Sequence, residues 1–199
     1  MSVDKPISST DEPDLDGLPG PADRLFEFIG QAPIGQSDFS KRQAWYFYIN
    51  GYKDAADLLV DHTGMERDAR KLGYPVLFLY RQHLELALKA LVRDCRLFVG
   101  LDEVFPKTHR IDELWKICCG LLNEISPGMA SNEEVLHTSR LIADLCRVDP
   151  NSEAFRYPED RNSNLPELDI ETALSGVRET VGKISLLIDC ISTNLSVRR

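Results

Sequence analysis

The longest apolar-rich stretch of the chain runs from Tyr74 to Phe98 and has the periodicity of a helix. Its large apolar side chains recur at steps of three and four residues, which is the spacing of one helix face: Leu77, Tyr80, Leu84, Leu88, Leu91, Cys95 and Phe98. Other apolar residues lie off this stripe, so the segment is apolar around most of its circumference. A helix of this kind is covered by neighbours on several sides. The pattern therefore predicts a central helix.

Four further segments repeat a helical spacing, and no run of four or more alternating residues predicts a strand. We expect these helices at residues 38–62, 110–124, 131–148 and 169–194. Together with the central segment they predict an all-α fold, a bundle of about five helices.

Glycine, proline and polar residues mark where these helices should begin, end or be approached closely. Gly51 lies inside the first helix and suggests close approach by the central one. Residues 65–71 should form a separate turn or a lead-in, and Pro75 is expected in the first turn of the central helix. The sequence Ser131-Asn132-Glu133-Glu134 fits a capping box at the start of the fourth helix.

The chain divides into a tail, a short connecting region and one helical domain. Residues 1–20 are rich in Asp, Pro, Ser and Gly, which predicts a disordered acidic tail. Residues 21–37 should form a short helix and a linker, and residues 38–199 the domain. Within the domain, residues 149–168 form a long loop before the last helix. We expect Phe155 and Tyr157 to hold this loop in an ordered position on the body.

Composition and charge exclude several classes of function. The formal net charge is −9, so the chain is a poor non-specific binder of nucleic acid, although a nucleic acid or nucleotide ligand stays open. No signal peptide and no apolar run long enough to cross a bilayer are present, which predicts a cytoplasmic protein without membrane contact. The five cysteines lack metal-ligand spacing and are expected to be buried, reduced thiols. No nucleotide, metal or hydrolase motif is present, so we expect no cofactor and no metal.

The most suggestive candidate chemistry is a charged ladder on the central helix. Arg81, Glu85 and Lys89 follow one another at steps of four residues, so they lie on one face, whereas His83 points to another. A charged ladder on a buried helix either pairs internally or faces a cleft that contacts an anion or a base.

Four residues outside that helix complete the candidate binding set. His109 precedes the third helix and is either a packed residue at the helix start or an imidazole facing a cleft. Arg156, Tyr157 and Arg161 lie in the long loop, where the arginines either bind an anion or pair with neighbouring carboxylates.

Three stretches resemble bacterial proteins of the HEPN superfamily: WYFYINGYKDAADLLV at 45–60, LYRQHLELALKAL at 79–91 and HRIDELW at 109–115. The resemblance covers residues 38–196 and implies a small helical bundle of a kind that often forms homodimers. Many HEPN proteins are metal-independent ribonucleases or toxins of toxin–antitoxin and phage-defence systems. Their catalytic signature is an Arg followed four to six residues later by a His, near the start of the closing helix.

This chain departs from that signature. Near the expected place it has Arg161, with Pro166 and Glu167 where a His would be needed. We therefore expect a non-catalytic binding or interaction module of a bacterial stress, toxin–antitoxin or phage-defence system, acting as a homodimer or with a protein partner. The alternatives are a divergent ribonuclease with a cleft around Arg81, His109 and Arg156, and a purely structural dimer partner.

Overall fold

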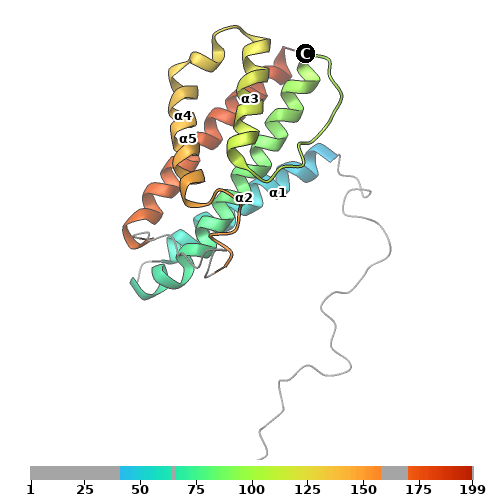
Figure 1. The fold of residues 1–199 in the computed structure, drawn as a ribbon. Coiled ribbons are helices and arrows are strands. Elements are labelled where there is room, and N and C mark those ends of the chain that lie inside the picture. Colours follow the sequence, from blue (N-terminus) through green and yellow to red (C-terminus); the bar gives the residue numbers. More distant parts are fainter. Residues whose placement is uncertain (1–40, 64–65, 158–169, 199) are drawn as a thin grey trace, which may run out of the picture.

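Five α-helices form the body of the protein in the computed structural model, which describes residues 41–63, 66–157 and 170–198. They are α1 (Lys41–His62), α2 (Glu66–Phe98), α3 (Ile111–Ile125), α4 (Glu133–Val148) and α5 (Ile170–Val197), with a short 3-10 turn at Met129–Ser131 (Figure 1). No strand occurs in these ranges, so the all-α prediction is confirmed. The expected tail, short helix and linker at residues 1–37 lie outside the described residues.

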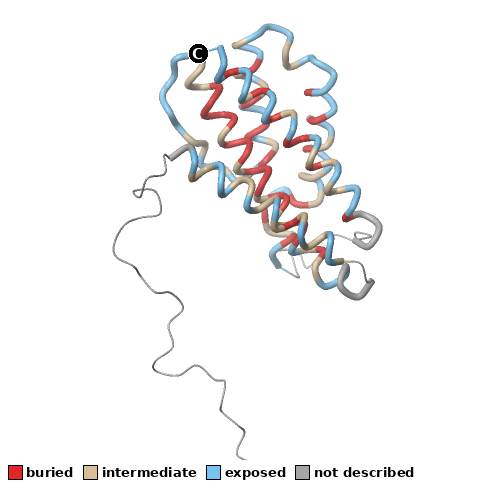
Figure 2. Tube along the Cα trace, turned by 180° about the vertical axis from the view of Figure 1, so that it is seen from behind, coloured by how far each residue is buried: buried red, intermediate tan, exposed pale blue. Residues whose placement is uncertain are grey.

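Helix α2 is the centre of the bundle, as its periodicity predicts. It packs against α1, α3 and α5, whereas α4 packs on α3. Leu84, Leu88 and Leu91 of α2 are almost completely buried. Figure 2 shows the buried residues gathered in the middle of the bundle and the exposed ones on its outer faces. An apolar helix surface on several sides is stable only under such cover.

The start of α2 agrees with the expected lead-in and differs from the prediction in the place of Pro75. Residues 66–71 are continuous with the central helix, and Pro75 lies inside it instead of in its first turn. Proline lacks a backbone N–H and removes one hydrogen bond of the helix ladder. Because Pro75 is exposed, water reaches this part of the helix, and packing of the residues that follow keeps the helix continuous.

Two local predictions were wrong. An added Cβ at Gly51 would meet no atom within 4 Å, so α2 does not approach this glycine closely. The N-cap of α4 is Asn132, whose side chain accepts a hydrogen bond from the Glu134 backbone N–H, while Ser131 belongs to the preceding 3-10 turn. Asn and Ser are nearly equivalent as N-caps, so the choice depends on the turn before them.

Only one of the two aromatic residues expected to anchor the connection after α4 on the body is buried. Phe155 is buried, but Tyr157 is 55% exposed and does not anchor the chain. The rest of the predicted loop, including Arg161, lies outside the described residues. The cysteine prediction also holds in part, because Cys95 and Cys118 are buried whereas Cys190 is exposed.

Candidate functional site

The charged ladder of α2 faces the interior of the bundle. Arg81 and Glu85 have side chains only 1% and 2% exposed, and the Lys89 side chain is 11% exposed. Leaving such charges unpaired in the interior would cost several kcal/mol each, in the range of roughly 3–5 kcal/mol. Their partners therefore decide whether the cluster is structural or is free to bind a ligand.

Glu85 is the common acceptor of the cluster. Its carboxylate lies 3.2 Å from Arg81 Nη1, 2.9 Å from Lys89 Nζ and 2.8 Å from His109 Nδ1. Burial alone would raise the pKa of Glu85, but the hydrogen bonds from Lys89 and His109 outweigh burial, and the pKa is lowered. Glu85 is therefore ionised near neutral pH and neutralises the cations around it.

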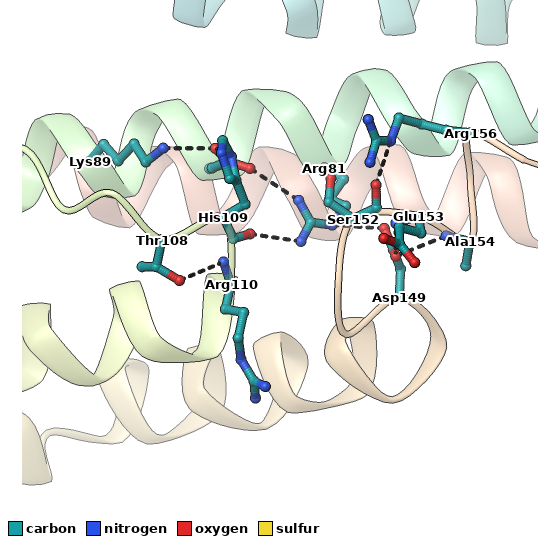
Figure 3. A network of polar contacts seen from close by, with 11 residues as sticks. Arg81, Lys89, Thr108, His109, Arg110, Asp149, Ser152, Glu153, Ala154 and Arg156 are labelled. Carbon is teal, nitrogen blue, oxygen red and sulfur yellow. Dashed lines mark hydrogen bonds and ion pairs between the residues drawn. The ribbon is translucent and has the colours of Figure 1, made fainter. Parts of the chain in front are cut away.

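Arg81 uses its remaining donors on groups from other parts of the chain. Its Nη2 donates to the His109 backbone carbonyl at 2.9 Å, and its Nε lies 2.8 Å from Asp149 Oδ2 (Figure 3). The latter contact is an ion pair whose atoms are not aligned as a hydrogen bond. Arg81 thus joins α2 to the start of α3 and to the chain after α4, and its guanidinium offers no open face to an anion.

Asp149 is the residue that sequence reasoning missed. It is 1% exposed, and its Oδ1 accepts from the backbone N–H groups of Glu153 and Ala154 at 2.8 and 3.0 Å. These bonds close the turn that follows α4 and hold the carboxylate toward Arg81. The only signal in the sequence is an Asp at the head of Asp-Pro-Asn-Ser, a composition typical of a turn whose first side chain bonds its own backbone.

His109 has the orienting partner that the sequence did not reveal. Because the ionised Glu85 carboxylate can only accept, the Nδ1 of His109 is the protonated nitrogen in their 2.8 Å contact. The His109 side chain is 70% exposed, whereas Glu85 behind it is buried. A histidine oriented by a carboxylate is one element of proton-transfer sites, but such a site also needs a group that holds the reacting anion.

His83 lies on another face of α2 and ties three helices together. Its Nδ1 lies 2.9 Å from the Ile49 carbonyl oxygen of α1, and its Nε2 lies 2.6 Å from the Ser185 hydroxyl of α5. Burial is the main cause that lowers the pKa of His83, so the ring is neutral near pH 7. In that state Nδ1 donates to the carbonyl, and the Nε2 lone pair and the Val181 carbonyl, 2.8 Å from the hydroxyl oxygen, compete for the one proton of the Ser185 hydroxyl. His83 is a structural histidine that does not join the charged ladder.

The two described loop residues of the candidate set, Arg156 and Tyr157, form their contacts within the loop. Arg156 donates from Nε to the Ser152 carbonyl, and its guanidinium lies 5.3 Å from the ring centroid of Tyr157. Ser152 has a positive φ of 64°, which is in the left-handed region, and it lies in the turn that follows α4. Arg156 and Tyr157 are both exposed, so among the described members of the predicted set the structure brings together Arg81, Glu85, Lys89 and His109.

No family model, curated protein or solved structure matches this chain. The HEPN resemblance accordingly stays a prediction. Among the described residues, no group of three or more His, Cys, Asp or Glu side chains is placed to hold a metal ion. None of the described helices combines the length and the apolar character that spanning a bilayer requires.

Replacing Glu85 tests whether the cluster is structural. Glu85→Gln should destabilise the fold by about 3–5 kcal/mol, because it removes the charge that Arg81 and Lys89 share. Lys89→Met should cost clearly less, since Glu85 keeps Arg81 and His109 and the lysine is partly solvated. Urea unfolding of both variants measures the difference. Equal effects would show that Glu85 is not the common acceptor.

The lowered pKa of His83 predicts how stability depends on pH. The unfolded chain protonates this ring near its ordinary pKa of 6.5 and the folded chain only at lower pH, so stability is complete above 6.5 and falls below it. Unfolding at about pH 7.5 and pH 5.5 should show this loss in the wild type, a smaller loss in His83→Gln and an unchanged loss in His137→Gln. A His83→Gln variant with the wild-type slope would contradict the assignment.

Proposed function

We propose that this protein is a non-catalytic interaction module, and that the groove between α4 and α5 is its binding surface for a second copy of the chain. The proposal rests on one observation. Helix α4 packs on α3 and α5 packs on α2, which leaves a hollow of about 810 Å³ lined by residues of both outer helices. The same proposal includes that the module acts in the cytoplasm of a bacterium and in a stress or defence system, both of which the sequence led us to expect.

The groove has the apolar character of a protein interface. Leu141 of α4 and Ile184 and Leu187 of α5 line it, and Leu186 lies beside them with 64% of its surface exposed. A large exposed leucine next to an apolar hollow suits a two-fold arrangement, because the leucine of each copy can enter the groove of the other.

The charges around the groove favour self-association at this place. Glu134 and Asp144 are balanced by Arg140 and Lys183, so the formal charge of the lining is zero. The whole chain carries −9, and two copies therefore repel one another over most of their surface. A neutral, apolar region is where this repulsion opposes contact least.

The charged cluster supports a module without catalysis. A ribonuclease with a cleft around Arg81, His109 and Arg156 needs a cation that can hold the phosphate. Arg81 is buried and already bound to Glu85, Asp149 and the His109 carbonyl. Arg156 is engaged with Ser152 in the loop. Among the described residues, the contact between His109 and Glu85 favours the ribonuclease alternative.

Two leucines of equal exposure provide a matched test of the interface. Leu186 on α5 and Leu58 on α1 are each 64% exposed. Leu186→Glu should weaken dimerisation by roughly a hundredfold or more, because each dimer loses two buried leucines worth about 1.5–3 kcal/mol apiece. Analytical ultracentrifugation of the 22.5 kDa chain over a range of concentrations measures this constant.

Leu58→Glu is the control and should leave the dimer intact, since it introduces the same charge on another face. A monomeric wild type would contradict the proposal. So would a dimer that Leu58→Glu dissociates and Leu186→Glu does not.

An assay with single-stranded RNA separates the module from the ribonuclease. Purified protein should not cleave the RNA above background, and His109→Ala should behave like the wild type. A catalytic imidazole contributes roughly 10²–10⁴-fold, so its removal would be obvious. Cleavage that survives purification, disappears in His109→Ala and persists in His137→Ala would favour the ribonuclease instead.

A further inference from the structure

A second hollow, separate from the α4–α5 groove, lies where α1, α2 and α5 meet. Its volume is about 330 Å³, which is within the range of small-molecule sites. Helix α1 contributes Trp45 and Tyr46, α2 contributes Arg93 and Asp94, and α5 contributes Asp189 and Ser192. Aromatic rings, carboxylates and a hydroxyl thus surround one space.

The two carboxylates of this hollow differ in their partners. Asp94 is buried and its Oδ1 accepts from Arg93 Nε and Nη2 at 3.1 and 3.0 Å, so this pair is neutral. In the described part of the chain, the Asp189 carboxylate forms neither a hydrogen bond nor an ion pair. The formal charge of the lining is therefore one negative unit, located on Asp189.

Asp189 is an exposed residue at this hollow, and neighbouring atoms cover its carboxyl group only in part. This partial cover raises the pKa of the carboxyl group, and nearby His83 reverses the effect only in part. Because Asp189 is exposed, water screens most of this effect on the stability of the fold. A cation that enters the hollow would still favour the charged form of the carboxylate.

The walls suit a cation that carries an apolar group. The Trp45 ring is held parallel to the Phe105 ring, with centroids 4.5 Å apart and an interplanar angle of 3°. Ala87 and Ala90 of α2 also line the hollow, and their small side chains leave room for an alkyl or aryl stem. Aromatic faces attract cations as well as apolar groups.

We propose that this hollow binds a primary ammonium group on a short apolar stem, with the ammonium at Asp189 and the stem against Trp45. A free small amine and a lysine side chain of another protein carry the same chemistry. The hydroxyl of Ser192 lies one turn of α5 beyond Asp189 and can accept from the ammonium as well.

Nuclear magnetic resonance titrations of the full-length protein test this site. The probes are phenethylamine for a free amine and Nα-acetyl-lysine amide for a protein side chain. Their neutral counterparts are 2-phenylethanol and Nα-acetyl-norleucine amide. We expect saturable shifts of the Asp189 and Ser192 amides and the Trp45 indole N–H with the amines, and much smaller shifts with the neutral compounds. The tighter of the two amines identifies the source of the ligand.

Asp189→Asn should weaken binding by roughly tenfold or more, as expected for loss of a charge-assisted contact. It should leave the unfolding midpoint equal to or above that of the wild type, which distinguishes a ligand-binding carboxylate from a structural one. Asp54→Asn removes the same charge from the exposed side of α1 and should change neither quantity. Absence of shifts with both amines, equal shifts with the neutral compounds, or unchanged affinity in Asp189→Asn would overturn the proposal.

Discussion

The buried guanidinium of Arg81 is the constraint on which the arrangement of the bundle depends. A charge that is 1% exposed must be matched, and Arg81 is matched by Glu85 on its own helix, by Asp149 after α4 and by the His109 carbonyl before α3. The contacts with Asp149 and the His109 carbonyl fix where two segments, the one before α3 and the one after α4, meet the central helix. Buried ion pairs of this kind add less to net stability than to the uniqueness of one arrangement, and we infer that role here.

Because the charged groups of this cluster are paired inside the protein, binding to a second molecule is expected at other surfaces. Within the described residues, Arg81 and Glu85 form their contacts with one another and with the chain itself. By contrast, the α4–α5 groove leaves apolar side chains uncovered, and the Asp189 carboxylate has no hydrogen-bond or ion-pair partner in the part of the chain that the structure describes. Interactions that the folded chain leaves incomplete are those that a second molecule can complete, which is why both proposals lie at these two places.

Sequence periodicity was enough to predict the helices and the central place of α2, because burial of apolar residues on one helix is a local pattern. The four-residue spacing also predicted that Arg81, Glu85 and Lys89 share a face. It could not predict Asp149, nor that Glu85 orients His109, since both contacts join residues far apart in the chain. The predictions for Pro75 and Gly51 were wrong because they used only local preferences. Proline usually lies in the first turn of a helix, but tertiary packing of α2 keeps the helix continuous on both sides of Pro75. Glycine inside a helix often allows a close contact, but no atom of the described residues approaches Gly51 in this way.

A double-mutant cycle between Arg81 and Asp149 tests most directly whether the buried cluster holds the bundle together. Arg81→Met keeps an apolar side chain at the site, and Asp149→Asn keeps the oxygen that accepts from Glu153 and Ala154. Arg81→Met should cost about 3–5 kcal/mol of unfolding free energy, because it leaves the buried Asp149 carboxylate without the guanidinium. Asp149→Asn should cost less, because Arg81 keeps Glu85 and the His109 carbonyl. The double variant should lose at least about 1 kcal/mol less than the sum of the singles. Costs that add to within about 0.5 kcal/mol would show that the two residues are not coupled and that the bundle does not depend on this contact.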